Sequence, residues 1–293
     1  MFTPLDDQGK FLQLYSSNYD LYRFNAIINF SFSENSELFL ALGTSNKSIL
    51  FFYFDDSTTQ LIQLNEVHNI HCKAISSLAF IKKRNVIISG SSDFTIRLGR
   101  VSLKKNEMSC KINKSNIILD YQPQITLVGH VDAISTINYN DENDLVISGG
   151  NEGVIFVWDA TTGKEKYSYK AHTNWVCSLK FFRLGINHKI VSGGADGKIC
   201  LYDINSTSYN KVQLYQEGET PEWISYVDYL ENDRYILICQ VKRVIILNAY
   251  NLNAVYQINN DGMAIHGAFQ LKVNDQNGIV FIHSNGLTYS ILN

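Results

Sequence analysis

The stretch ISGGNEGVIFVWD at residues 147–159 recurs in this chain as ISGSSDFTIRL at residues 88–98 and as VSGGADGKICLYD at residues 191–203. Each copy is an apolar run, a tight polar turn and a second run in which apolar and polar residues alternate, a pattern typical of a β-hairpin. A further alternating run precedes each copy, and a histidine stands before that run. The sequence therefore predicts a repeated unit of three sequential antiparallel strands.

A fixed spacing connects the polar residues of the three copies. The acidic residue lies four positions after the serine, and a third marked position lies six further on. The sets are His71, Ser89, Asp93 and Gly99; His130, Ser148, Glu152 and Trp158; and His172, Ser192, Asp196 and Tyr202. With Gly129-His130 opening one unit and Trp158-Asp159 closing it, this pattern resembles the WD-repeat (WD40) family, whose members are all-β propellers with four-stranded blades.

The resemblance implies that each set is an internal polar network, in which the acid holds the histidine and the histidine reaches the serine and the tryptophan. Gly99 and Tyr202 depart from tryptophan, and Glu152 departs from aspartate. The residue types also match a hydrolase triad. We interpret the sets as structural because three active sites in one small chain are implausible, so no catalytic residue is expected.

The flanks continue the strand pattern without the polar signature. Six blades are readable, and seven remain the alternative; their equivalent points are Gly43, Gly90, Gly149, Gly193, Cys239 and Ile282. Residues 1–293 are predicted to be a single WD40 β-propeller domain, because the repeat runs nearly end to end. Its ring is expected to be closed either by an N-terminal strand, from residues 10–15 or 19–24, or by a partner's strand.

Composition narrows the function classes. The formal net charge is −3, and no apolar stretch is long enough to span a bilayer or to follow a basic region as a signal peptide. The five cysteines are scattered and are interpreted as reduced thiols in the cytoplasm or nucleus: Cys72, Cys110, Cys177, Cys200 and Cys239. No phosphate loop is present, so no cofactor and no small-molecule substrate are expected.

Two other groups of residues were considered for chemistry. His68, His71 and Cys72 lie close in sequence, but no fourth ligand has useful spacing, so no metal site is predicted. His266 and His283 are the remaining candidates for an active site, and neither has an obvious partner in the sequence.

Two tryptophans mark the first candidate partner site. When the innermost strands are aligned, Trp175 and Trp223 occupy neighbouring blades at a position where other blades have alanine. The resemblance to WD-repeat propellers places this position at the rim of the central opening. Exposed tryptophan is enriched at interface hot spots. The alternative is that each ring packs onto an adjacent loop and stiffens the seam between blades.

A basic region marks the second candidate site. The interval from Gly90 to Gly149 is the longest, which indicates an insertion between Val101 and Ile125. Its lysines and a basic turn in the same blade are expected at one end of that blade and are candidate partner contacts: Lys82, Lys83, Arg84, Lys104, Lys105 and Lys111. The alternative is a solvated loop that Asp141, Glu142 and Asp144 partly neutralise.

These features favour a non-catalytic scaffold that presents surfaces to other proteins, as a WD-repeat subunit of a multiprotein complex. One alternative is a non-catalytic or esterase-like subunit of a modifying enzyme. Another is a binder of RNA or phospholipid through the basic insertion. The overall negative charge argues against a dedicated nucleic-acid binder, and no membrane span is expected.

Overall fold

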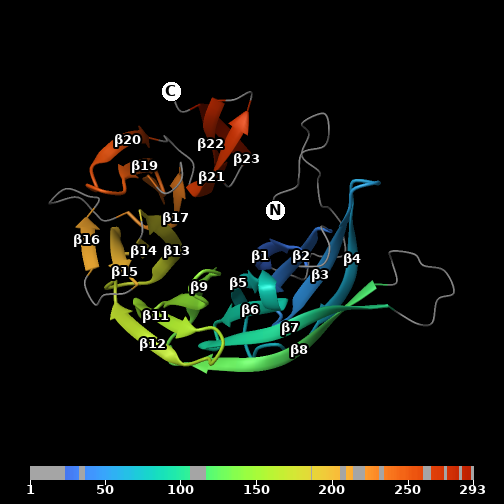
Figure 1. The fold of residues 1–293 in the computed structure, drawn as a ribbon. Coiled ribbons are helices and arrows are strands. Elements are labelled where there is room, and N and C mark those ends of the chain that lie inside the picture. Colours follow the sequence, from blue (N-terminus) through green and yellow to red (C-terminus); the bar gives the residue numbers. More distant parts are fainter. Residues whose placement is uncertain are drawn as a thin grey trace. The chain divides into compact units, whose positions relative to one another are not determined.

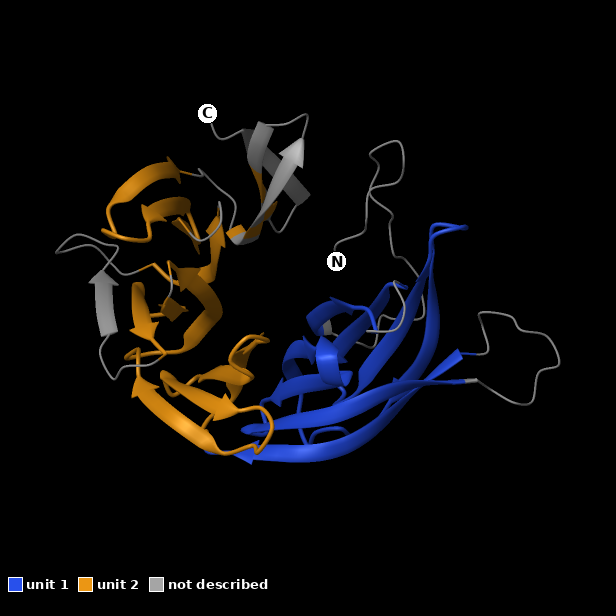
Figure 2. Cartoon of the chain, in the orientation of Figure 1, with its two compact units in different colours: residues 1–129 blue, residues 130–293 orange. Residues whose placement is uncertain are grey.

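The structure is a computed structural model that describes residues 24–32, 37–105, 117–185, 187–204, 209–213, 222–230, 234–259, 265–273, 276–283 and 286–291. These residues form sequential antiparallel sheets, in which each strand pairs with the next along the chain (Figure 1). The chain divides into two compact units, residues 1–129 and residues 130–293 (Figure 2). No helix among the described residues is long and apolar enough to cross a membrane.

The first unit contains two four-stranded sheets. The first sheet is β1 (Phe24–Phe30), β2 (Phe39–Thr44), β3 (Ile49–Asp55) and β4 (Gln60–Val67). The second sheet is β5 (Ile75–Ile81), β6 (Val86–Ser91), β7 (Thr95–Lys105) and β8 (Ile117–Val128), with the short 3-10 helix η2 (Lys82–Arg84) between β5 and β6. One apolar core joins the two sheets, and a cluster of phenylalanines around Phe30 and Phe39 fills it.

The second unit contains the other four sheets. The third is β9 (Ile134–Asn140), β10 (Leu145–Gly150), β11 (Val154–Asp159) and β12 (Glu165–Lys170); the fourth is β13 (Val176–Leu184), β14 (Asn187–Gly194), β15 (Lys198–Asp203) and β16 (Tyr209–Gln213). The fifth is β17 (Ile224–Leu230), β18 (Tyr235–Gln240), β19 (Arg243–Asn248) and β20 (Ala254–Asn259); the sixth is β21 (Ile265–Val273), β22 (Gln276–His283) and β23 (Gly286–Ile291).

The innermost strand of every sheet carries one extra residue in a β-bulge near its start. The extra residues are Asn25, Ser76, Ser135, Cys177, Ser225 and His266. Three of their side chains donate hydrogen bonds to the backbone of the next sheet: Asn25 to the Ile75 carbonyl at 3.2 Å, Ser225 to the Ile265 carbonyl at 2.8 Å, and Ser135 to the Val176 carbonyl. Because a bulge re-aims a side chain, these residues link neighbouring sheets within each unit.

The predicted all-β fold of sequential antiparallel sheets is confirmed. Five of the six described sheets have four strands and the sixth has three. The segment at residues 10–15 that was predicted to close the ring, and residues 19–23 of the alternative segment, lie outside the described residues.

The insertion differs from the expected loop, because much of it is strand. β7 and β8 pair from Thr95 and Val128 out to Lys105 and Ile117, well beyond the end of β6. The side-chain amide of Asn65 in β4 donates to the Leu119 carbonyl and accepts from the Leu119 N–H, both at 2.9 Å. These bonds, with burial of Val101 and Leu119 in the core, explain why the inserted residues form strands. The tip at residues 106–116 is outside the described residues.

Candidate functional site

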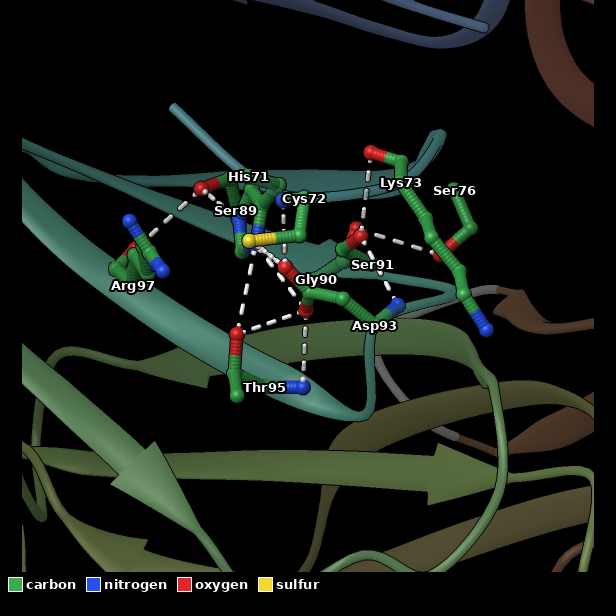
Figure 3. Close-up of polar contacts among 10 residues, drawn as sticks. All are labelled: His71, Cys72, Lys73, Ser76, Ser89, Gly90, Ser91, Asp93, Thr95 and Arg97. Atoms are coloured by element: carbon green, nitrogen blue, oxygen red, sulfur yellow. Dashed lines mark hydrogen bonds and ion pairs between the residues drawn. The ribbon is translucent and has the colours of Figure 1, made fainter. Parts of the chain in front are cut away.

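The second sheet brings together three of its four marked residues (Figure 3). His71 hydrogen-bonds through Nδ1 to the Asp93 carboxylate at 3.1 Å and through Nε2 to the Ser89 hydroxyl at 2.8 Å. Asp93 also accepts from the N–H of Cys72 at 2.8 Å and from the hydroxyl of Thr95 at 2.6 Å. Because a carboxylate only accepts, Nδ1 carries the histidine proton, and Nε2 accepts from the serine.

The third sheet contains all four members of the network. His130 contacts Glu152 through Nδ1 and the Ser148 hydroxyl through Nε2 at 2.7 Å. The indole N–H of Trp158 donates to the same hydroxyl at 2.9 Å. The indole is thereby satisfied inside the core, and the network joins β10, β11, the turn between them and the loop that precedes the sheet.

The fourth sheet follows the same plan. His172 bonds to Asp196 at 2.8 Å and to the Ser192 hydroxyl at 2.9 Å, and Asp196 accepts from the Thr173 N–H at 3.1 Å. Tyr202 is fully buried, and its ring packs on Tyr169 of β12, in the neighbouring third sheet, at a centroid distance of 4.5 Å. This contact places an apolar ring at the position that tryptophan fills in the third sheet.

The serines and histidines of the three networks are buried. Ser89, Ser148 and Ser192 are all 0% exposed, so no substrate can reach a serine oxygen without opening the sheet. Burial lowers the pKa of His71 and of His130, although Asp93 and Glu152 oppose the shift. His71 and His130 are therefore held neutral at physiological pH.

The carboxylates of the two aspartates are strongly acidic. Burial raises the pKa of Asp93, but hydrogen bonds from Thr95 and from the Cys72 N–H outweigh it and bring the pKa to about 2. Burial likewise raises the pKa of Asp196, and the bond to His172 contributes most to lowering it to about 2. Both aspartates therefore stay ionised and keep accepting hydrogen bonds at physiological pH.

An aromatic residue of the second sheet was missed by the sequence analysis. Gly99 pairs with Ile87 as Trp158 pairs with Val146, so it occupies the tryptophan position. A Cβ atom on Gly99 would lie 2.1 Å from Cζ of Tyr121, a residue of β8. The Tyr121 ring therefore fills this space from the neighbouring strand. A glycine within a strand often marks a place where another group comes close to the backbone, and Gly99 was the signal in the sequence that could have indicated this ring.

The Tyr121 ring is not an equal substitute for the indole. Burial raises its pKa to about 12, against the opposing effects of Arg97 and the Ser89 hydroxyl. Its hydroxyl lies close to the network, but among the described residues it makes no hydrogen bond of normal geometry. Tyr121 thus replaces the packing of tryptophan without replacing its hydrogen bond.

The two candidate tryptophans lie against each other. Trp175 precedes β13 and Trp223 precedes β17; their ring centroids are 5.5 Å apart and the planes are tilted by 58°. The rings are nevertheless 44% and 49% exposed. The backbone beneath is fixed, because the Trp175 carbonyl accepts from the Ala195 N–H at 2.9 Å. The structure therefore presents a paired aromatic surface, here called the tryptophan pair.

The basic residues are less concentrated than their number in the sequence suggests. Lys82 and Lys83 are exposed on η2, and Arg84 is partly buried. Lys104 lies on the extended part of β7 and forms an ion pair with Asp120 of β8 at 2.8 Å. Lys105 ends the same strand, and Lys111 lies outside the described residues.

The acidic residues expected to neutralise this region have contacts within the second unit. Glu142 lies 3.2 Å from His188 and 3.9 Å from Arg183, and Asp144 accepts from the hydroxyls of Tyr139 and Thr161 at 2.7 Å and 2.6 Å. Asp120, which was not among the acidic residues named from the sequence, lies beside Lys104. Its position diagonally opposite Lys104 follows from the β7–β8 register.

The other residues considered for chemistry are spread over separate elements. His68 is exposed and lies 3.4 Å from Glu66, and Cys72 is exposed. Within the described ranges no group of three or more His, Cys, Asp or Glu side chains is arranged to hold a metal ion. His266 is the bulge residue of β21, and His283 ends β22 opposite Ile265. Burial raises the pKa of Cys177 to about 11 and that of Cys239 to about 12, which disfavours their reactive thiolates.

Comparison with known proteins agrees with this architecture. The family model described as the LRRK2 beta propeller matches residues 30–268, most of the chain. The chain belongs to the WD40-type β-propellers. A crystal structure of the computationally designed protein Ika8 has the same fold, with a TM-score of 0.63 at 19% identity over 92% of this chain and 71% of that chain.

Curated relatives of this propeller are WD-repeat proteins that it matches in part. It is 31% identical over 41% of its length to eukaryotic translation initiation factor 3 subunit I of Schizosaccharomyces pombe, and 23% identical over 60% of its length to the COMPASS component SWD3 of Saccharomyces cerevisiae. A guanine nucleotide-binding protein subunit beta of Oryza sativa subsp. indica is 27% identical over 33% of the chain. The matches span 34%, 51% and 23% of these relatives.

Proposed function

We propose that this chain is a non-catalytic interaction scaffold and a subunit of a multiprotein complex in the cytoplasm or nucleus, and that residues 1–293 act as one β-propeller domain. The family model supports the single domain, since it spans both compact units. Support for the scaffold role comes from the names of the relatives, which describe them as subunits or components. The buried state of all three serines further disfavours an esterase-like role.

One observation carries the proposal: the tryptophan pair is half-exposed although the two rings touch. Tryptophan buried only against its neighbour leaves a large apolar area in water, and such area is uncommon on a monomer unless a partner covers it. We therefore assign Trp175 and Trp223 to a protein contact.

The experiment replaces Trp175 and Trp223 with alanine, singly and together, in the full chain. Removing a hot-spot tryptophan costs about 2 kcal/mol or more of binding free energy, so each single variant should lower the affinity for a partner about 30-fold. Partners are measured by quantitative mass spectrometry of proteins that co-purify with each variant. Circular dichroism and a thermal melt then separate loss of binding from loss of folding.

Tyr167→Ala is the matched control, because Tyr167 is an aromatic residue of the same unit with similar exposure, at 41%. Partners that are lost with both tryptophan variants and kept with the control support the proposal. The same partners in the same amounts in all variants would reject the tryptophan pair as a contact. A lower melting temperature with unchanged partners would support the alternative, in which the rings stiffen the seam between blades.

The basic region is a second candidate surface, favoured by η2, whose three residues are all basic. An RNA or phospholipid bound here should lose affinity steeply as salt rises. Charge reversal at Lys104, Lys105 and Lys111 should abolish such binding. Binding that survives the reversal would exclude the insertion as an interface.

A further inference from the structure

Two outer hairpins of the second unit have the same backbone. In the β11–β12 turn, the Asp159 N–H donates to the Lys164 carbonyl at 2.9 Å, and the Gly163 N–H donates to the Asp159 carbonyl at 2.8 Å. In the β19–β20 turn, the corresponding bonds join Asn248 to Asn253 at 2.9 Å and Leu252 to Asn248 at 2.8 Å. Both following strands then carry one extra residue at the same register, Lys166 in β12 and Val255 in β20.

The β19–β20 turn adopts this backbone conformation with a loss of conformational free energy. Gly163 and Leu252 occupy its left-handed position, with φ of 72° and 60°. A residue with a Cβ atom loses about 1 kcal/mol there relative to glycine. Packing of Leu252 on the core of the second unit offsets part of the loss. The two hairpins are therefore a matched pair whose side chains can be compared position by position.

The side chains of the two hairpins differ in charge. The Lys166 ammonium lies 3.6 Å from the Asp159 carboxylate. The other charged residues of β12 are Glu165 and Lys170. In the fifth sheet Asn248 lies at the position equivalent to Asp159, and Val255 lies at the position equivalent to Lys166. Residues 244–260 contain no charged residue, histidine or proline. Tyr250, Val255 and Tyr256 are 68%, 56% and 47% exposed. The turn and β20 are thus uncharged where their counterparts carry charges, and Arg243 at the start of β19 is the charged residue of this hairpin.

The neutrality of β20 sets it apart from the other outer strands. The fourth strands of the other four-stranded sheets each carry a charge, namely Glu66 in β4, Asp120 in β8, Lys166 in β12 and Lys211 in β16. Proteins usually guard an edge strand with a charge or a proline, because its free N–H and C=O groups can pair with another strand. Within the described ranges β20 pairs with β19 alone, so its other edge is open.

We propose that β20 pairs antiparallel with β20 of a second copy of this chain. In a two-fold antiparallel contact residue i of one strand faces residue j of the other and j faces i, so a charge near the axis would face a like charge. β20 carries no charge, so no register of this contact brings like charges together, whereas an unlike partner is usually selected by complementary charges. The exposed Tyr250, Val255 and Tyr256 add apolar area on both sides of the seam. One short strand makes a small interface, so the dissociation constant should be on the order of 10–100 µM.

Sedimentation equilibrium of the purified full chain tests the pairing between about 1 and 500 µM, a range that brackets the expected constant. The weight-average mass should rise from 33.3 kDa toward twice that value. The test variant is Asn248→Asp with Val255→Lys, which transplants the Asp159–Lys166 pair onto the same backbone and should therefore fold. It should weaken association at least ten-fold, since both copies then place lysine at the seam.

Ser168→Lys is the control, because it adds the same charge to the exposed face of β12 in the same unit. It should dimerise like the unmodified chain. Mixing Val255→Lys with Val255→Glu should restore association that neither variant shows alone. A chain that stays at 33.3 kDa throughout, or a transplanted variant that associates as tightly as the original, would overturn the proposal.

Discussion

The polar networks of the second and third sheets solve the same packing problem with different residues. In the third sheet the aromatic group comes from β11, and the Trp158 indole both fills the core and donates to Ser148. In the second sheet the aromatic position is Gly99, and Tyr121 reaches over it from β8. The comparison teaches that the network requires a ring above the serine but does not require it from one particular strand.

The compensation explains why Gly99 and Tyr121 must be considered together. A glycine alone at this position would leave a cavity, and a tyrosine alone would clash with a side chain on β7. The long β7–β8 pairing, held by Val101 and Leu119 in the core, is what places Tyr121 over the glycine. The same insertion that appears as an interruption of the repeat therefore supplies its missing ring.

Replacing Trp158 with alanine should give the largest loss of stability. The side chain is 2% exposed, and its removal leaves a cavity beside His130 and removes the hydrogen bond that Ser148 accepts from the indole. We expect the free energy of unfolding to fall by about 3–5 kcal/mol, measured by urea denaturation. Trp158→Phe keeps most of the volume and should show the smaller loss of the hydrogen bond, about 1 kcal/mol. Equal losses for both variants would refute a packing role.

Gly99→Ala in the second sheet should cost about 1–3 kcal/mol, because the added Cβ overlaps the Tyr121 ring. The loss should shrink when Tyr121 is also replaced by alanine. A double-mutant cycle in urea measures this coupling. Additive effects of the two substitutions would contradict an energetic coupling between the Tyr121 ring and Gly99.

The repeated sets of residues were predictable because spacing and alternation survive in three copies. Aligning the innermost strands was also enough to put Trp175 and Trp223 on successive sheets, and the structure brings their rings to 5.5 Å. The first and fifth sheets lack the signature because Leu42 and Ile238 occupy the serine position and are buried. An apolar residue there needs no polar partners, so only the strand pattern remained in the sequence.

Tyr121 could not be predicted with the same tools, because it lies in an insertion that has no counterpart in the other copies. The register of β7 and β8 shifts between Leu98 and Gly99, and this irregularity decides which residue faces the glycine. The similarity of the β11–β12 and β19–β20 turns could not be recognised from the sequence either. Their backbones match while nearly every side chain differs, and only backbone hydrogen bonds reveal it.

Stability of both networks should depend on pH through their histidines. The folded-state pKa of His71 and of His130 lies below the usual value of 6.5, mainly because of burial. The unfolded chain therefore binds more protons than the folded chain as pH falls through 6.5, and stability is lost below that value. Each histidine contributes at most about 1.4 kcal/mol per pH unit.

Urea midpoints between pH 5 and 8 measure this dependence. His130→Gln should reduce the pH dependence of the free energy of unfolding by the contribution of one histidine. The aspartates act at lower pH: with a folded pKa of about 2, Asp93 and Asp196 contribute stability above their usual value of 3.8 and lose it as pH falls through 2. A flat profile from pH 8 to pH 5 would contradict the neutral, buried state of the histidines.

Glu152→Asp in the third sheet should give the smallest change in stability. Glu152 folds over Gly150, where a Cβ would lie 2.1 Å from its Oε2, and this oxygen is buried with no hydrogen-bond partner among the described residues. Asp93 and Asp196 instead accept backbone N–H groups from Cys72 and Thr173. A shorter acid in the third sheet should reach the corresponding N–H, so we expect a gain of about 0.5–1 kcal/mol in urea. A loss above 1 kcal/mol would mean that the longer side chain is required to reach His130.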